Sequence, residues 1–240
     1  MKCFKALFGL IPLAFAIGCG LFNKAPNAKI SKLNPNEFIE GFDSLMNLEI
    51  RIISMDSASK LDDESIQYLK VNKGEFSLFL QSNKTFISLV HLEIDSLNID
   101  SIPDRILQMK NLEHLILSNN QIKSIPSWFF KLKKLTYLNL ENNQLSSLPL
   151  TFFQIPKLQY LNLDHNQLNQ LDPMICKFKS IREIKLNENE LKDIPLCLSE
   201  IKSLERVELW GNKLSKPEQS LLRSKFKKIN IRLGEQKKDN

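Results

Sequence analysis

Two histidines stand where they could share a metal ion. His91 and His114 occupy the same position of two successive sequence repeats, and Glu93 and Glu113 lie close to them in the sequence. Imidazole and carboxylate groups are common zinc ligands, but a zinc site usually takes three or four protein ligands. No third ligand is fixed by spacing here. We therefore interpret these side chains as surface polar residues, and we expect no metal and no cofactor.

The four cysteines suggest little further chemistry. Cys3 and Cys19 belong to the N-terminal segment, whereas Cys176 and Cys197 fall at different positions of neighbouring repeats. We therefore expect Cys176 and Cys197 not to face each other and to be free thiols, with a disulfide as the less favoured alternative. No CxxC, HExxH or GxSxG motif and no glycine-rich phosphate loop occurs in the sequence. We expect no enzymatic activity.

The elements that hold these residues come from a sequence repeat with a period of 23. Five rows open at Leu112, Leu135, Leu158, Ile181 and Leu204. The first four carry apolar residues at positions 1, 4, 6, 11, 14, 18 and 21, and the fifth keeps this pattern up to position 11. Positions 3 to 8 alternate between polar and apolar residues, which predicts a short strand with one buried face. Because one such unit cannot bury its own apolar face, the rows must stack on one another.

Position 9 is asparagine in all five rows. A buried asparagine amide can both donate and accept hydrogen bonds, so it can satisfy the backbone groups that leave the sheet at the end of a strand. We assign this structural role to Asn120, Asn143, Asn166, Asn189 and Asn212.

This pattern resembles the bacterial leucine-rich-repeat family in its 23-residue form, LxxLxLxxNxLxxLPxxFxxLxx, which is common in leptospiral proteins. The resemblance runs from about Leu89 to the C-terminus. It implies an α/β repeat solenoid, shaped as a horseshoe with a concave parallel β-sheet, an irregular or 3-10 convex side, and a cap at each end. We expect repeats over residues 66–216, with two degenerate rows before the five clean ones.

The N-terminal segment resembles a lipoprotein leader. Lys2 and Lys5 precede an apolar run that is too short to cross a bilayer, where ~20 residues are needed. The run ends in Ala16-Ile17-Gly18-Cys19, which resembles a lipobox with alanine in place of the usual leucine. We predict a signal peptide over residues 1–18, lipidation of Cys19 and a tether over residues 19–36. Plain secretion and an uncleaved anchor are the alternatives.

Caps are expected at both ends of the repeats. Residues 37–65 place apolar residues first at helical and then at strand spacing, and we assign them to the N-terminal cap. Residues 217–233 read as a helix followed by a final strand, which we expect slightly less than one repeat period after the strand of the last row. This segment is the expected C-terminal cap, and residues 234–240 form a polar tail.

Outward-facing strand positions are the candidate binding surface. Position 3 holds every tyrosine of the chain, and tyrosine and histidine combine an apolar body with a polar tip. Such side chains also pack on cross-strand neighbours for purely structural reasons. We expect the rings to point away from the core, so that folding hardly depends on them. The candidate partner-binding residues are Tyr68, His91, His114, Tyr137, Asn139, Glu141, Tyr160, Asn162, Asp164, Glu183, Arg206 and Trp210.

Charge separates the two sides of the predicted solenoid. Between Leu112 and Lys216, positions 2, 3, 5, 7 and 8 carry seven acidic and three basic residues, whereas the other positions carry four acidic and eleven basic residues. Nucleic acid binding requires a basic surface, so the acidic concave face argues against nucleic acid there.

We therefore predict a non-enzymatic module that is anchored by lipid in the bacterial envelope, with the outer membrane as the expected location and secretion as the alternative. Its partner would be a protein, with host proteins among the candidates, and it would contact the membrane through the lipid anchor. A periplasmic scaffold or inhibitor is the alternative function.

Overall fold

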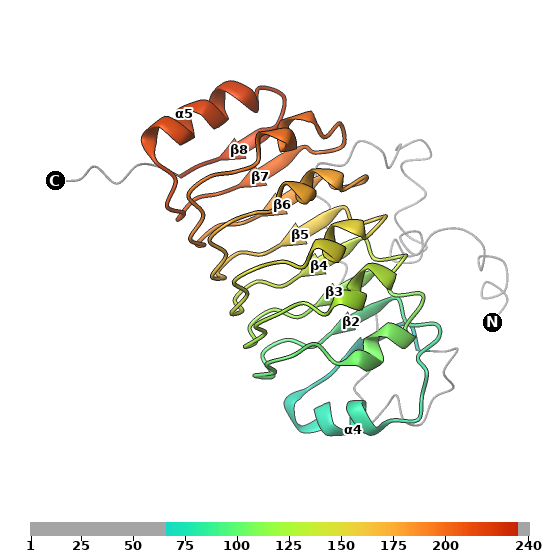
Figure 1. Ribbon diagram of the computed structural model, residues 1–240. Helices are drawn as coiled ribbons and strands as arrows, with labels where there is room; N and C mark the ends of the chain where they lie inside the picture. Colours follow the sequence, from blue (N-terminus) through green and yellow to red (C-terminus); the bar gives the residue numbers. More distant parts are fainter. Residues whose placement is uncertain (1–65, 235–240) are drawn as a thin grey trace, which may run out of the picture. The chain divides into compact units, whose positions relative to one another are not determined.

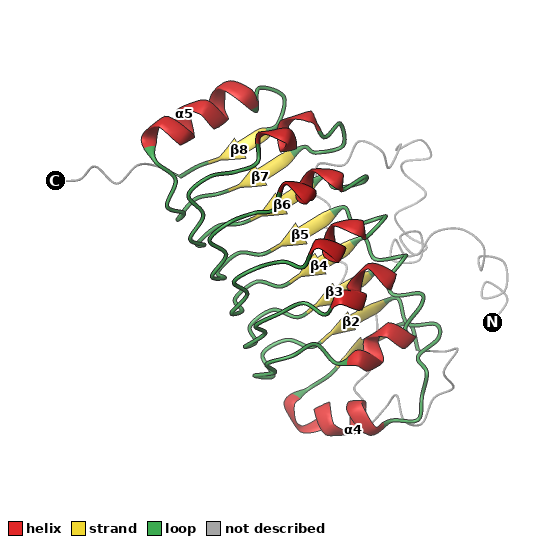
Figure 2. Cartoon of the chain, in the orientation of Figure 1, coloured by secondary structure: helices red, strands yellow, loops and turns green. Residues whose placement is uncertain are grey.

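The computed structural model describes residues 66–234 of the 240-residue chain. Three-residue strands stack side by side in one parallel sheet, and short helices form a second layer (Figures 1 and 2). The predictions for the signal peptide, Cys19, the tether, the N-terminal cap and residues 235–240 concern residues outside this range. In chain order the elements are β1 (Tyr68–Lys70), η4 (Lys73–Glu75), α4 (Phe76–Gln81), β2 (His91–Glu93), η5 (Asp104–Gln108), β3 (His114–Ile116), η6 (Ser127–Lys131), β4 (Tyr137–Asn139), η7 (Leu150–Gln154), β5 (Tyr160–Asn162), η8 (Pro173–Lys177), β6 (Glu183–Lys185), η9 (Leu196–Glu200), β7 (Arg206–Glu208), α5 (Lys216–Lys225) and β8 (Asn230–Arg232).

The strands follow the period of two that the sequence predicts. The middle residue of each strand from β1 to β7 is Leu, Ile or Val, and all seven are fully buried. Each strand pairs in parallel with its sequence neighbours, in the order β1 to β8. Equivalent residues of successive rows therefore lie side by side, for example His114 opposite Tyr137. This sheet and its 3-10 turns confirm the predicted repeat solenoid.

The second layer consists of one short 3-10 helix in each of the middle repeats. A residue with extended backbone, usually proline, precedes each of these helices, as Pro126 precedes η6 and Pro149 precedes η7. Proline suits this place because it has no N–H to offer and its φ is fixed. In the third clean row Asp172 replaces the proline, and its carboxylate accepts a bond from Met174 N at 2.8 Å. That carboxylate caps the helix, and Pro173 follows it.

The asparagines of position 9 bond to backbone groups of two rows. Asn143 Oδ1 accepts from Ile122 N at 3.0 Å, and its Nδ2 lies within bonding distance of the Leu117, Leu140 and Glu141 carbonyls. The same pattern recurs at Asn120, Asn166, Asn189 and Asn212. Each amide thus ties the strand exit of its own row to the row before it.

The residue at position 8 adopts a left-handed conformation in the row from Leu89 and in the five rows after it. Position 8 has a φ between 50° and 72° in six successive rows, at Ser96, Asn119, Asn142, His165, Glu188 and Gly211. Asparagine and glycine tolerate this region best. At Gly211 an added Cβ would also lie 2.6 Å from the Glu188 carboxyl carbon. These residues turn the chain out of the sheet and fix the exit edge of these six repeats.

The two ends of the described solenoid depart from the repeat. In the first row η4 and the α-helix α4 come earlier in the repeat than the 3-10 helices η5 to η9 do in the later rows. At the C-terminal end α5 precedes β8, and Leu222, Phe226 and Ile229 are buried. Val207 pairs with Ile231, so the final strand lies slightly more than one repeat period after β7, and not slightly less as predicted. The longer α5 takes up the additional length of chain.

Cys176 and Cys197 form a disulfide, which corrects the prediction of two free thiols. The two cysteines lie in the neighbouring helices η8 and η9, and their Cα atoms are 5.9 Å apart. Residues at the same position of two rows point in the same direction. Two side chains can therefore face each other between neighbouring rows only from different positions. Cys176 at position 19 and Cys197 at position 17 satisfy this condition. The bond closes a loop that stabilises the fold by ~3 kcal/mol in the chain-entropy description.

Candidate protein-binding face

The strand register arranges the outward side chains of the sheet in columns. Position 3 forms one ring column from β1 to β5. The ring centres lie 6.0 Å apart for Tyr68 and His91, 6.0 Å for His91 and His114, 5.7 Å for His114 and Tyr137, and 4.4 Å for Tyr137 and Tyr160. The last pair is nearly parallel, with 8° between the ring planes. The rings therefore stack face against face along the solenoid.

Stacking buries more of these rings than the sequence predicts. Tyr160 is 7% exposed and His91 is 1% exposed, whereas Tyr68, His114 and Tyr137 are half-buried. Lys185 of β6 also places its Nζ 5.7 Å from the centre of the Tyr160 ring. The expectation that folding hardly depends on the rings must therefore be revised, because each ring packs on its neighbours. A partner would meet ring edges and polar tips, since neighbouring rings cover the faces.

Burial also sets the ionisation of this column. It lowers the pKa of His91 to about 3, with further contributions from the nearby His114 and Lys70, and it lowers the pKa of His114 to about 4. Burial likewise raises the pKa values of Tyr68 and Tyr160 above that of free tyrosine. These two histidines and two tyrosines are consequently uncharged at neutral pH.

An amide and carboxylate network lies beside the rings. Glu141 Oε2 accepts from Asn162 Nδ2 at 2.9 Å, and Asp164 Oδ1 accepts from Asn187 N at 2.6 Å. Asn187 Nδ2 donates to Asp164 Oδ2 and to Glu208 Oε2, both at 3.1 Å. Burial raises the pKa of Asp164 to about 6, although the bonds from Asn187 act in the opposite direction. The network holds three carboxylates in fixed positions along β4 to β7.

Asn187 belongs to this network but is absent from the predicted site. It occupies position 7, the same column as Glu141, Asp164 and Trp210. Its Oδ1 also accepts from Trp210 N at 3.1 Å. The column position alone would have indicated it, whereas its many bonds are visible only in three dimensions.

Charged residues continue the face towards the C-terminal end. Arg206 lies 3.9 Å from Glu183 and 3.7 Å from Glu208, and Arg232 lies 3.3 Å from Glu208. Glu183 and Arg206 are almost fully buried, and burial raises the pKa of Glu183. Breaking such a buried pair on one side leaves an uncompensated charge, so Glu183 and Arg206 also contribute to the structure.

Trp210 is the most exposed of the predicted site residues. It is 40% exposed, and its ring meets the exposed His165 edge-on with 6.3 Å between the ring centres. His165 was not predicted for the site, because position 8 lies just beyond the strand. The structure thus divides the twelve predicted residues into a half-buried or exposed set that a partner can touch and a buried set that supports it. The first set is Tyr68, His114, Tyr137, Asn139, Glu141 and Trp210, and the second is His91, Tyr160, Asn162, Asp164, Glu183 and Arg206.

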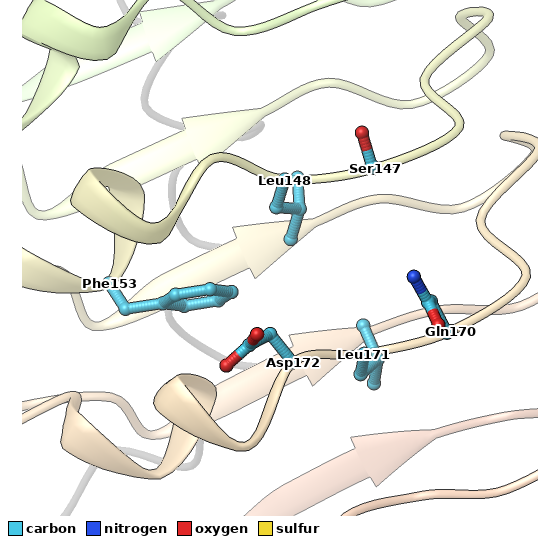
Figure 3. A pocket seen from close by; sticks show the side chains of 6 residues that line it. All are labelled: Ser147, Leu148, Phe153, Gln170, Leu171 and Asp172. Carbon is cyan, nitrogen blue, oxygen red and sulfur yellow. The ribbon is translucent and has the colours of Figure 1, made fainter.

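No metal cluster accompanies this face among residues 66–234. That part of the chain contains no group of three or more His, Cys, Asp or Glu side chains that could hold a metal ion. A small hollow of about 90 Å³ lies between two neighbouring repeats, lined by Ser147, Leu148, Phe153, Gln170, Leu171 and Asp172 (Figure 3). Ligand sites are usually several times larger, and the Asp172 carboxylate is already used as a helix cap. Within the same residues, no helix has the length and apolarity to span a bilayer.

Sequence comparison identifies the family. The family model described as "Leucine rich repeat" matches residues 87–145, 126–168 and 156–214, which together make up just over half of the chain. This chain is a leucine-rich-repeat protein. Such proteins generally bind other proteins and are typically not enzymes, so the domain suggests a protein-interaction module. No curated protein matches the chain.

Solved leucine-rich-repeat structures share the fold. A leucine-rich-repeat protein of Leptospira interrogans is 28% identical, with a TM-score of 0.51 over 69% of this chain and 46% of that one. An internalin of Listeria monocytogenes is 19% identical, with a TM-score of 0.53 over 71% of this chain and 47% of that one. The present chain therefore spans less than half the length of either structure. The first likeness supports the predicted resemblance to leptospiral proteins.

Proposed function

We propose that this leucine-rich-repeat protein is a non-enzymatic binding module, lipid-anchored in the bacterial envelope, that holds a protein partner on its concave face. The observation that carries the proposal is the set of side-chain columns across β1 to β7, in which strand register fixes rings, amides and carboxylates at regular intervals. A rigid, polar and continuous surface of this kind suits recognition of an extended protein surface.

Three features of the face favour binding over catalysis. The histidines of the ring column are neutral and lie within a stack, so they are poorly placed to transfer protons. The carboxylates are hydrogen-bonded to amides or paired with arginine. Exposed Trp210 and half-buried Tyr137 are residue types that are enriched at protein interfaces.

The disulfide supports a location outside the cytoplasm. Disulfides form and persist in oxidising compartments such as the bacterial periplasm and the cell surface, and they are rare in the cytosol. The Cys176–Cys197 bond therefore agrees with the leader-like segment at residues 1–18.

Site-specific photo-crosslinking tests the binding face. A photoreactive phenylalanine analogue would replace Tyr137 or Trp210, and Leu150 would serve as the control because it is 55% exposed on the convex layer. In cells of the source organism we expect both concave positions to trap the same protein, identified by mass spectrometry. Trapping of that protein from Leu150 but not from Tyr137 and Trp210 would place the interface on the convex layer and refute the proposal.

Detergent partitioning tests the lipid anchor. Cys19→Ser removes the thiol that would carry the acyl groups, so this variant should leave the detergent phase and enter the aqueous phase. A variant that partitions like the unmodified protein would disprove lipidation at Cys19. Protease treatment of intact cells then separates two locations, because only a protein on the outer surface would be cleaved. Protection from the protease would favour the periplasmic scaffold or inhibitor.

A further inference from the structure

Lysines recur in the turns that lead into the strands. A two-residue turn precedes each of the six strands from β3 to β8, and every one of these turns contains at least one lysine. We name these residues the lysine edge: Lys110, Lys133, Lys134, Lys157, Lys179, Lys202, Lys227 and Lys228. None of the six turns contains an acidic residue or an arginine.

Contacts between successive turns hold this edge in order. Asn111 Nδ2 donates to the Ile87 carbonyl at 2.6 Å, Lys134 Nζ donates to Asn111 Oδ1 at 2.6 Å, and Ser180 Oγ donates to the Pro156 carbonyl at 3.2 Å. The strands that follow pair in register, at ~4.8 Å from one to the next, so the six turns form a row ~24 Å long. The lysines are thus presented along one continuous border of the sheet.

The charges of the lysine edge are not neutralised within the described part of the chain. All eight lysines are exposed, and none forms a salt bridge with another residue of the 66–234 range. Neighbouring positions add four basic residues, Lys131, Lys177, Arg182 and Lys225, against three acidic ones, Glu113, Glu200 and Glu205. Of these, Glu205 is 3.9 Å from Arg182. The edge therefore keeps a strong excess of positive charge.

The opposite edge of the same repeats shows that this charge is not a general property of the surface. Positions 8 and 10 of the five clean rows lie where the chain leaves the strands. They hold Asn119, Gln121, Asn142, Gln144, His165, Gln167, Glu188, Glu190, Gly211 and Lys213. Lys213, the one lysine among these ten residues, is paired with Glu190 at 2.9 Å. One edge is basic along six turns, and the other is neutral to acidic.

We propose that the lysine edge docks the solenoid on an anionic lipid surface. Lysine is a compact point charge that attracts phosphate without requiring a fixed geometry, whereas arginine is preferred for bidentate recognition. The six turns contain no aromatic residue on which bases could stack, as single-stranded nucleic acid binding usually requires. A row of exposed ammonium groups suits the phosphates of a flat bilayer surface, where each lysine contributes independently.

Vesicle co-sedimentation tests this proposal on the full-length chain. Every protein carries Cys19→Ser, so that no acyl chain can contribute. The edge variant is Lys157→Glu with Lys179→Glu and Lys202→Glu. The control is Lys123→Glu with Lys192→Glu and Lys216→Glu, which changes three exposed lysines outside the lysine edge and alters the net charge equally. Circular dichroism would establish that both variants fold.

The vesicles contain equal parts of phosphatidylcholine and phosphatidylglycerol, or phosphatidylcholine alone. We expect the edge variant to bind the anionic vesicles about tenfold more weakly or worse, and the control variant to lose no more than about twofold. Added salt should weaken binding of the parent protein, because the charges are exposed and screened. Equal binding by the parent and edge variants would overturn the proposal, and so would equal losses in both variants. Loss of binding to a single-stranded oligonucleotide with unchanged vesicle binding would assign the edge to nucleic acid instead.

Discussion

At the scale of single residues, the position-9 asparagines join the rows most directly. The Asn143 side chain is buried and bonds to backbone groups at Ile122, Leu117, Leu140 and Glu141. Asn143→Leu keeps a similar volume but leaves buried donors and acceptors without partners. We expect a loss of about 1–3 kcal/mol in the free energy of unfolding, read from the urea midpoint. Gln121→Leu, on the exposed exit edge, should leave the midpoint unchanged. An unaltered midpoint in Asn143→Leu would remove the structural role.

Buried His91 and half-buried His114 make stability depend on pH. In the folded protein the pKa values of His91 and His114 are lowered to about 3 and about 4, from 6.5. Between the lowered pKa values and 6.5, the unfolded chain therefore binds more protons than the folded protein does. The free energy of unfolding consequently decreases as the pH drops from about 6.5 towards 4. Asp164, whose pKa is raised to about 6, acts in the opposite direction over part of this range.

Thermal unfolding at a series of pH values tests this dependence. The melting temperature of the parent protein should decrease as the pH is lowered below 6.5. The double variant His91→Gln with His114→Gln should show a weaker dependence of the melting temperature on pH. If the double variant keeps the slope of the parent, other groups control the acid sensitivity.

The sequence reveals residue columns better than it reveals burial within them. The repeat period places Tyr137 beside Tyr160 and aligns the asparagines, because equivalent positions of a stacked repeat must be neighbours. The same period does not show that ring stacks bury one another or that Asn187 bridges two carboxylates. Those features depend on side-chain rotamers. It also conceals the Cys176–Cys197 pair, because facing residues must come from unlike positions.

At the scale of elements, α5 and β8 close the last repeat. Leu222, Phe226 and Ile229 are buried there, and β8 pairs with β7. Truncation after Lys216 would expose this apolar end and the backbone of β7. We expect aggregation or loss of cooperative unfolding, measured by analytical ultracentrifugation and urea denaturation. Removal of residues 235–240 alone should change neither. A monomeric truncated protein that unfolds cooperatively would make the C-terminal segment an appendage.

Strands and convex turns can be predicted from the sequence because the same pattern of apolar and polar residues recurs in each repeat. Five copies of one spacing average out local exceptions, such as Asp172 in place of proline. The terminal elements have no such redundancy. In the first row α4 comes earlier in the repeat than the 3-10 helices of the later rows, and the last strand lies further from its neighbour in sequence than the regular period. Both departures occur in the first and last rows of the described solenoid, where the regular spacing is not kept.

At the scale of the whole molecule, the repeat distributes different chemistry to different sides. Residues at position 3 form the ring column, and residues at position 7 supply acids and amides to the network beside it. The turns before β3 to β8 contain the lysine edge. One strand register produces all three features. Residues in each can be substituted without disturbing the core beneath them, except where rings stack on one another or ion pairs are buried. The architecture is therefore readable from sequence, whereas the identity of a partner depends on the few residues that vary down each column.

The disulfide between η8 and η9 also has a mechanical consequence. When a solenoid is pulled by its ends, its repeats separate one after another, because each contacts only its neighbours. The bond joins residues 21 apart in sequence whose Cα atoms are 5.9 Å apart, so this stretch cannot be drawn out. The fully extended chain is then shorter by roughly 65 Å than the reduced chain. Oxidation thus limits how far the molecule can reach under tension before a covalent bond must break.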